Sequence, residues 1–291
     1  MVRLCRAVSQ NGGDVVNSLR LFRDIGGGIG RRMFKSDYVT VVTATTGHRD
    51  LLRCLKSVQA QSYRQVEHLV VVDGPEHQEK VAAVLAQLPA GSKPPQVIQL
   101  PQATGKNGWC GHRIYAAASF LANSEFVAFL DEDNWYDADH VESLVSALRT
   151  ANARWAFSLR KIVDKDGAFI ANDLCESLGN LHGVFSNPEA ALVDTSCYLL
   201  TLELAVGFAS VWFGPTQPGP GGEERDWALC KTLLQYAPEA CTNLKHTLNY
   251  TVGNRANSVQ GAYFLHGNEE MRKRYPDGMP WEKVTLPGIQ L

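Results

Sequence analysis

Paired cysteines, long apolar runs and net charge are all scarce in this sequence. Its seven cysteines are scattered and include no C-x-x-C pair, which argues against a disulfide framework or zinc site and favours a reducing, cytoplasmic compartment. No apolar run approaches the ~20 residues that a membrane-spanning helix needs. The net charge of −2 gives no reason to expect nucleic acid as the main partner.

The overall composition is that of an ordinary globular protein, and only the first residues differ from it. The 291 residues are 45% hydrophobic and 20% charged, enough chain for one large or two medium domains. Residues 1–35 carry seven Arg or Lys against two Asp, a local net charge of +5. One interpretation is a basic arm over residues 1–37 that makes peripheral contact with an anionic membrane surface or a partner. The alternative is a loosely ordered extension.

Strand and helix patterns alternate regularly after residue 37. The first segment, residues 38–43, is β-branched and apolar, which is typical of a buried strand. Alternation with short polar joints implies parallel strands, so we expect an α/β fold with a Rossmann-like, mostly parallel sheet flanked by helices. The further predicted strands cover 68–73, 97–100 and 126–130, and the predicted helices cover 49–61, 77–88, 110–123 and 139–148.

The character of the chain changes after residue 151. Residues 154–163 and 168–171 flank an Asp-Gly turn, which predicts an antiparallel hairpin and a smaller antiparallel portion of the sheet. A glycine- and proline-rich stretch over 216–222 predicts a loop. The other predicted elements are a strand over 191–200, a helix over 228–236 and a strand over 246–252, followed by a mixed, polar tail.

The most informative motif is an apolar strand that ends in acids. Phe126–Leu130 is followed directly by Asp131, Glu132 and Asp133. Since side chains alternate along a strand, we expect Asp131 and Asp133 to project together and Glu132 to point away. Two hard carboxylate ligands on one side suit Mg²⁺ or Mn²⁺ with a substrate phosphate. A simple acidic turn that caps the next helix is the alternative, because a lone D-x-D is a short match.

Three predicted strands end in polar side chains, and this convergence strengthens the D-x-D. Thr43, Asp73 and Asp131 each stand at the carboxyl end of a strand. Ligands of open parallel sheets collect beyond those ends, so we expect these residues to face one site. Asp226 follows the glycine-rich loop at the start of a predicted helix.

The order of these motifs resembles the GT-A fold of family 2 glycosyltransferases over residues 38–255. The resemblance implies a metal-dependent, inverting glycosyltransferase that uses a nucleotide-sugar donor. It divides the chain into an extension (1–37), a domain with a nucleotide-binding half (38–150) and an acceptor half (151–255), and a tail (256–291). The segments that carry it are YVTVVTATTGHRD, LVVVDG, GHRIYAAAS, FVAFLDEDNW and GGEERDWAL.

The resemblance also assigns roles in binding the donor. Thr43 and Arg49 would frame the nucleotide, and Asp73 would contact its base or ribose. His112 and Arg113 match the region beside the phosphates or the sugar. Asp131 and Asp133 match the D-x-D, with Asp133 as the direct ligand of Mn²⁺ or Mg²⁺.

Two further roles are less fixed by the resemblance. Asp226 aligns with the family's catalytic base, but Arg225 replaces the acid before it, so Glu224 just upstream is an alternative base. A late histidine of the family often binds the metal or pyrophosphate. His246 lies close by, although Asn254 or Arg255 aligns nearer that position.

The sequence leaves the acceptor and two other protein classes open. The acceptor is a saccharide, a lipid-linked molecule or another hydroxyl compound. A non-catalytic nucleotide-sugar-binding module would share the fold. A sugar-phosphate nucleotidyltransferase would need a glycine-rich phosphate loop after the first strand, whereas residues 43–49 contain one glycine.

Overall fold

The computed structural model describes residues 34–185, 191–215, 225–254 and 258–283. The basic segment predicted near the start lies almost wholly outside these ranges, as do Glu224 and Arg255. The fold and the site are therefore built from the four described ranges.

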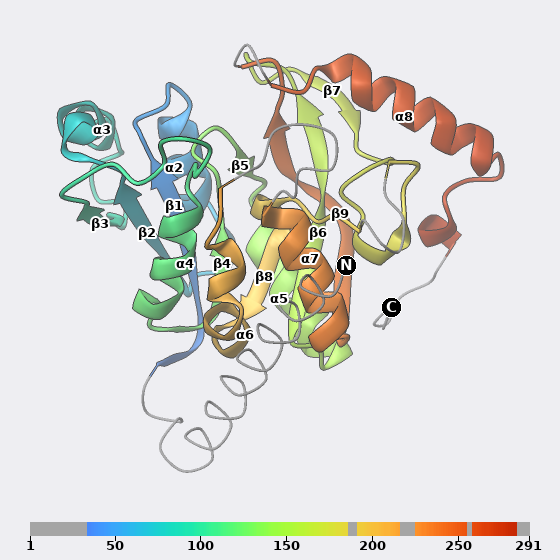
Figure 1. Cartoon of the computed structure of the whole chain (residues 1–291), viewed down its shortest axis with the longest axis horizontal. Coiled ribbons are helices and arrows are strands. Elements are labelled where there is room, and N and C mark those ends of the chain that lie inside the picture. The colour runs from blue at the N-terminus through green and yellow to red at the C-terminus, as the bar shows by residue number, and fades with distance from the viewer. Residues whose placement is uncertain (1–33, 186–190, 216–224, 255–257, 284–291) are drawn as a thin grey trace, which may run out of the picture.

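One nine-stranded sheet forms the centre of the molecule (Figure 1). Its strand order is β3-β2-β1-β4-β8-β6-β9-β5, and β7 pairs with the outer part of β6. This arrangement confirms the predicted α/β class, with a mostly parallel half and a second half that mixes both directions. The parallel half consists of β1 (Lys35–Thr45), β2 (Val66–Val72), β3 (Gln96–Gln99) and β4 (Ser124–Phe129).

The second half contains the predicted hairpin and three further strands. β6 (Trp155–Val163) and β7 (Phe169–Asn172) pair antiparallel, as the Asp-Gly turn indicated. β8 (Tyr198–Thr201) runs antiparallel to both β4 and β6, and so joins the two halves of the sheet. β9 (Ala240–Thr251) is parallel to β6, and the short β5 (Trp135–Tyr136) is antiparallel to β9.

Helices cover both faces of the sheet because its central strands are apolar on both sides. All seven residues of β2 are buried, as expected for a parallel strand between helix layers. In Figure 1, α4, α6 and α7 lie in front of the sheet and α5 lies behind it. The helices are α2 (Leu51–Gln59), α3 (Gln78–Leu85), α4 (His112–Leu121), α5 (His140–Ala151), α6 (Leu202–Gly207) and α7 (Arg225–Tyr236).

A further helix, α8 (Gly261–Arg274), forms where the sequence indicated a mixed, polar tail. Phe264, Gly267, Asn268 and Met271 are buried at the i, i+3, i+4, i+7 spacing of a helix that has one apolar face. Phe264 and Met271 belong to the same hydrophobic core as the sheet. This part of the predicted tail is therefore integral to the fold.

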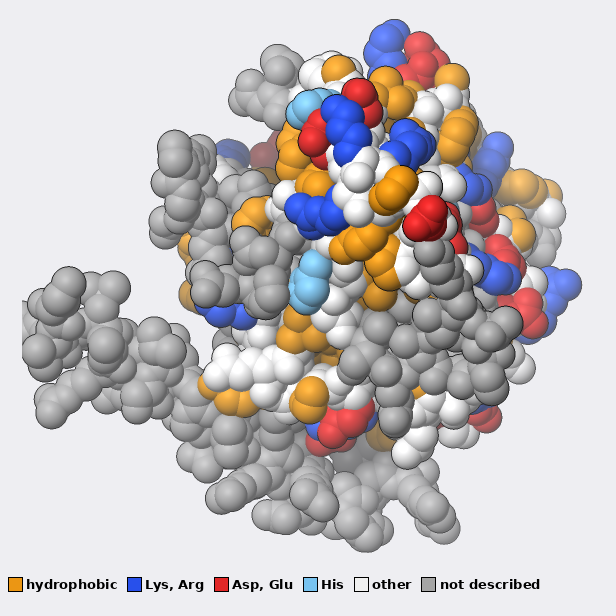
Figure 2. Space-filling view, turned by 90° about the vertical axis from the view of Figure 1, so that its right-hand side faces the viewer, with side chains coloured by type: hydrophobic (Ala, Val, Ile, Leu, Met, Phe, Trp, Pro, Cys, Tyr) orange, Lys and Arg blue, Asp and Glu red, His pale blue; other side chains and the backbone are white. Residues whose placement is uncertain are grey.

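The surface on the α8 side of the molecule carries both signs of charge. Figure 2 shows Lys and Arg side chains interspersed with Asp and Glu. On α8 itself, Lys273 pairs with Glu269 and Glu270. Within the described ranges, no helix is both long enough and apolar enough to cross a bilayer. Six cysteines lie in those ranges and none of them forms a disulfide.

Candidate active site

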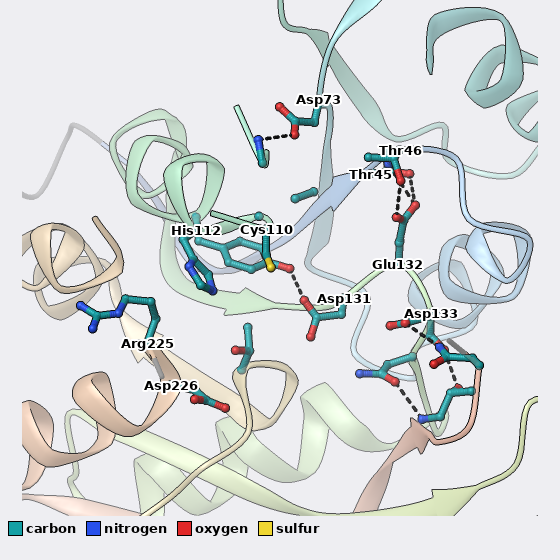
Figure 3. Close-up of a pocket in the computed structure, with 18 of the residues that line it drawn as sticks. Thr45, Thr46, Asp73, Cys110, His112, Asp131, Glu132, Asp133, Arg225 and Asp226 are labelled. Carbon is teal, nitrogen blue, oxygen red and sulfur yellow. Dashed lines mark hydrogen bonds between the residues drawn. The ribbon is translucent and has the colours of Figure 1, made fainter. Parts of the chain in front are cut away.

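A cavity of about 560 Å³ opens at the carboxyl ends of β1, β2 and β4. Asp73, Asp131, Asp133 and Asp226 all line it. In Figure 3, Asp131 and Asp133 point into a space that Asp226 enters from the opposite side. The structure therefore brings together four acids that are separated by up to 153 positions in the sequence, counted from Asp73 to Asp226.

Asp131 is the more enclosed carboxylate of the D-x-D. Its Oδ1 accepts a hydrogen bond from the Tyr115 hydroxyl at 2.5 Å, and its Oδ2 accepts one from Ser196 at 3.3 Å. Burial, together with the negative charges of Asp133 and Asp194, raises the pKa of Asp131 to about 7. A positive group beside this carboxylate would therefore favour its charged form.

Asp133 is held by the end of β9. Its Oδ2 accepts a hydrogen bond of 2.7 Å from the side-chain amide of Asn254. Its backbone carbonyl accepts one of 2.6 Å from the Thr251 hydroxyl. These contacts fix the segment after β4 against a strand from the other half of the sheet. Asn254, one of the two residues expected near the position of the late histidine, therefore contacts the D-x-D directly.

Glu132 points away from its two neighbours, as predicted, but it has a structural partner. Its carboxylate accepts four hydrogen bonds from the end of β1 and the loop that follows, two of them from the Thr46 backbone N–H and hydroxyl. The Thr45 hydroxyl and the His48 N–H donate the other two, at 2.6 and 2.7 Å. Glu132 is only 7% exposed, so it locks the β1 loop onto the β4 end inside the protein.

We expect Glu132→Gln to lower the free energy of unfolding by about 2–4 kcal/mol. Hydrogen bonds to a charged group contribute about 1.5–3 kcal/mol each, and the glutamine amide would turn one acceptor into a donor that faces other donors. Thermal unfolding should then shift down by about 4–8 °C. Glu142→Gln is the matched control, because exposed Glu142 accepts one bond from Ser62. Equal melting temperatures for the two variants would contradict this role of Glu132.

Asp73, which directly follows β2, binds a neighbouring loop. Its Oδ1 accepts hydrogen bonds from the Thr104 N–H and hydroxyl, at 2.6 and 2.8 Å, and its Oδ2 accepts one from the Gly105 N–H at 2.8 Å. A Cβ at position 105 would lie 2.7 Å from Oδ2, so glycine permits this approach. Asp73 thus shapes the cavity wall and still lines the cavity.

The start of α4 and the start of α7 meet at the cavity. His112 Nδ1 donates to the Gly214 carbonyl at 3.0 Å, and burial lowers the pKa of His112. Because Nδ1 carries the proton in this bond, a neutral His112 offers Nε2 as an acceptor. Asp226 lies in the first turn of α7, where its Oδ1 accepts the Trp227 N–H at 2.9 Å. The Tyr198 hydroxyl donates to the Asp226 carbonyl.

Four residues predicted for the site do not line this cavity. Thr43 is fully buried and bonds His68, because β1 continues for two residues and brings Thr45 and Thr46 to the cavity instead. Arg49 extends over the surface to the Lys165 carbonyl in the β6–β7 turn. The two others are Arg113 and His246.

Arg113 and His246 have other surroundings. The guanidinium of Arg113 lies over the Trp109 ring, 3.7 Å from its centroid. His246 pairs with Leu159 in the middle of β9 and lies near Asp173. Tyr250, which does line the cavity, is four residues further on, about 13 Å along a strand. The structure therefore does not support His246 as a ligand of the predicted metal.

Other cavity residues were not found by sequence reasoning. Tyr115 lies within a helix whose apolar spacing gives no sign of a hydroxyl aimed at Asp131. Asp194 lines the cavity and Ser196 supports Asp131 from behind it, and both fall in the run that was predicted as one strand over 191–200. The structure instead places a turn of 3₁₀-helix at Thr195–Cys197 before the short β8. The only available signal was three consecutive polar residues, 194–196, inside an apolar run.

Comparisons with solved structures show what the fold resembles. The crystal structure of S. aureus TarS 1-349 in complex with UDP-GlcNAc superposes with a TM-score of 0.55 and 15% identity, covering 77% of this chain and 60% of that one. The complex of the same protein with UDP gives a TM-score of 0.53 and 16% identity, covering 86% of this chain and 76% of that one. A longer S. aureus TarS structure gives a TM-score of 0.51 and 16% identity, covering 86% of this chain and 46% of TarS.

The likeness to TarS, at this level of identity, shows a shared fold, and the chain spans 60% of the first of these structures. The search of curated proteins found no match. The model of the family described as glycosyl transferase family 2 matches residues 40–196, which is more than half of the chain. That region includes Asp73, Asp131 and Asp133, and Asp226 lies beyond it. The chain therefore belongs to glycosyl transferase family 2.

Proposed function

We propose that this protein transfers a sugar from a nucleoside-diphosphate donor to an acceptor hydroxyl, with inversion at the anomeric carbon. The observation that carries the proposal is the single cavity lined by Asp73, Asp131, Asp133 and Asp226. Acids at one end of this cavity suit a cation and a diphosphate, and an acid at the other end suits proton removal from an acceptor. Family membership supports the same reaction class.

The nucleotide would occupy the side of the cavity formed by the ends of β1 and β2. Thr45, Thr46 and Asp73 line this side. The Asp73 carboxylate already accepts three hydrogen bonds from residues 104 and 105, so a contact with the base or ribose would use its remaining lone pairs. Crevices outside the carboxyl ends of the strands are the usual nucleotide sites of open α/β sheets.

A divalent cation, Mn²⁺ or Mg²⁺, fits the residues of the D-x-D. Asp131 and Asp133 supply hard oxygens. The charge of Asp133 raises the pKa of Asp131, because the two negative charges repel each other. Among the described residues, no three His, Cys, Asp or Glu side chains form a metal-binding group, so donor phosphates would complete the coordination. When bound, the cation would act as a Lewis acid that stabilises the leaving diphosphate.

The protein's own residues would perform the remaining steps. Asp226 would accept the proton of the acceptor hydroxyl as that oxygen attacks the anomeric carbon from the face opposite the diphosphate. One such in-line displacement inverts the anomeric centre. Neutral His112 would accept a hydrogen bond from the donor through Nε2. Glu224, the alternative base, lies outside the described residues.

A thermal-shift screen tests donor binding. We expect one nucleoside diphosphate and its sugar conjugate to raise the melting temperature by about 5 °C at 100 times Kd, and to do so only with Mn²⁺ or Mg²⁺ present. UDP-GlcNAc and UDP are the first pair to test, because TarS has been crystallised with each. GDP, ADP, CDP and dTDP with their sugar conjugates complete the panel. If none of these ligands shifts the unfolding transition, the proposal is wrong.

The acceptor would be a saccharide, a lipid-linked molecule or another hydroxyl compound. Acceptor selection would depend on the loops around Asp226, because loops carry specificity in such folds. A non-catalytic nucleotide-sugar-binding module would give the same thermal shifts. It would differ in one respect, since it would release no nucleoside diphosphate from the bound donor.

A further inference from the structure

A buried arginine lies beneath the cavity and binds three carboxylates. Arg160, on β6, is 2% exposed. Its Nε donates to Asp173 at 2.7 Å, its Nη1 to Asp194 at 2.8 Å, and its Nη2 to Glu176. Burying a charged group is costly unless it is paired, and here one guanidinium serves three partners. Such an arrangement calls for an account of what each carboxylate does.

Two of the three carboxylates serve the protein interior. Asp173 also accepts hydrogen bonds from the backbone N–H groups of residues 175–177, which fixes the turn after β7. Glu176 accepts a bond of 2.8 Å from the Tyr263 hydroxyl, which ties the turn to α8. Neither carboxylate lines the cavity. Their contacts with Arg160 are explained by the packing of α8 and the hairpin.

The third carboxylate, Asp194, lines the cavity and is only 5% exposed. Each of its oxygens accepts one protein hydrogen bond, from Arg160 Nη1 and from the Ser196 N–H at 2.9 Å. A carboxylate oxygen can accept two, so Asp194 retains capacity for further donors. Substrate hydroxyls are the donors that a sugar-binding cavity would supply.

Asp194 lies in the cavity between the D-x-D, proposed to hold the diphosphate end of the donor, and Asp226, the proposed base. Ser196 donates its N–H to Asp194 and its hydroxyl to Asp131, so a single residue links Asp194 to the D-x-D. Tyr198, two residues further along, bonds the backbone of Asp226. The segment 194–198 thus connects the proposed diphosphate end to the proposed base, which is where a transferred sugar must lie.

We propose that Asp194 accepts hydrogen bonds from hydroxyls of the transferred sugar, and that Arg160 is the residue that positions Asp194. This inference rests on the proposed function. The Tyr250 and Phe264 rings pack against the guanidinium, with their centroids 4.3 and 5.1 Å from its Cζ atom. It therefore presents Asp194 in one orientation.

The arginine also accounts for how another acid can face a diphosphate. A bare carboxylate beside Asp131 and Asp133 would add repulsion toward the phosphates of the donor. Pairing with Arg160, which Asp194 shares with Asp173 and Glu176, offsets part of this charge and leaves the Asp194 oxygens as hydrogen-bond acceptors. The site can then bind neutral hydroxyls with less repulsion toward the nucleotide than an unpaired carboxylate would cause.

The test compares binding of a nucleotide sugar with binding of the nucleoside diphosphate alone. Calorimetric titrations use UDP-GlcNAc and UDP, or the matching pair selected by the thermal-shift screen. The Kd of the diphosphate divided by the Kd of the sugar conjugate gives the contribution of the sugar. We expect Asp194→Asn to weaken sugar-conjugate binding by about 10–100-fold, the usual effect of losing a hydrogen bond to a charged group. Binding of the diphosphate should change by less than about threefold.

Glu176→Gln is the matched control, because it removes another partner of Arg160 that does not line the cavity. It should leave the ratio of the two Kd values unchanged. Arg160→Lys should reduce the ratio as Asp194→Asn does, and the double variant should lose no more than either single variant. If Asp194→Asn weakens both ligands equally, or neither, the inference is wrong while the proposed function stands. If the wild-type protein binds no ligand of the panel, the proposed function itself fails.

Discussion

Asp226→Asn should retain donor binding and lose sugar transfer by about 10²–10⁴-fold in kcat, the range expected when a general base is removed. The amide keeps the shape of the side chain, including its acceptor oxygen for the Trp227 N–H, but it cannot take a proton. The proton moves only as the acceptor attacks, so the loss belongs to the transition state and should appear in kcat rather than in the donor Kd. Single-turnover transfer and calorimetry measure these two quantities separately.

The matched control for this variant is Glu239→Gln, which changes an exposed carboxylate just before β9. It should transfer sugar at the wild-type rate. Asp226→Asn should also melt within about 1–2 °C of the wild-type protein, since the residue is not part of the core. Turnover of Asp226→Asn equal to that of the control would remove Asp226 from the mechanism and transfer attention to Glu224.

The second large effect is expected at Asp133. Asp133→Ala should weaken donor binding in Mn²⁺ by about 100-fold or more, to the affinity that the wild-type protein shows in EDTA. The variant removes one of the two carboxylates proposed to hold the cation, and cation affinity depends steeply on the number of charged ligands. The measurement is a titration of the donor into both proteins, with Mn²⁺ and with EDTA.

Asp139→Asn is the control for Asp133, because it changes an acid six residues along that pairs with Lys245 and does not line the cavity. Its donor affinity should match the wild type in Mn²⁺. Because Asp133 also holds the amide of Asn254, Asn254→Ala separates the two functions of the carboxylate. If Asn254→Ala weakens binding as strongly as Asp133→Ala, then Asp133 acts through β9 and not through a cation.

The acids of the site could be predicted because their positions follow from local pattern. Strand β4 is apolar to its last residue, so the change to Asp131 marks the edge of the sheet. The alternation of strands and helices then places Asp73 at the same edge, since parallel strands end together. In α8, by contrast, the polar residues between Phe264 and Met271 concealed the spacing of the buried residues.

The residues that were misplaced depend on tertiary contacts and on exact strand lengths. β9 begins at Ala240, earlier than its β-branched part suggests, which leaves His246 in mid-strand and brings Asn254 to the cavity. β1 is also longer than the predicted strand and ends at Thr45 rather than Thr43. The direction of the Arg49 side chain is set by its contact with the β6–β7 turn, more than a hundred residues away in the sequence. No local pattern contains that information.

The Arg160 cluster could not have been predicted, because its members come from three separate segments. Asp173, Glu176 and Asp194 carry no spacing that marks them as partners of one arginine. Only the pairing of β6 with β7 and β8 brings them around it. The same pairing delivers Asp194 to the cavity, so part of the proposed sugar contact is a product of the topology.

The measurement that tests the central claim most directly is the release of nucleoside diphosphate from the bound nucleotide sugar in Mn²⁺. Over long incubation, water can take the place of the acceptor. ¹H NMR then identifies which anomer of the free sugar forms first, before the two anomers equilibrate. The proposed mechanism predicts that the wild-type protein releases the diphosphate with inversion. Asp226→Asn should release it at least about 10² times more slowly. A donor that binds tightly in Mn²⁺ and stays intact would contradict this mechanism, and so would a donor that Asp226→Asn or Asp133→Ala cleaves as fast as the wild-type protein does.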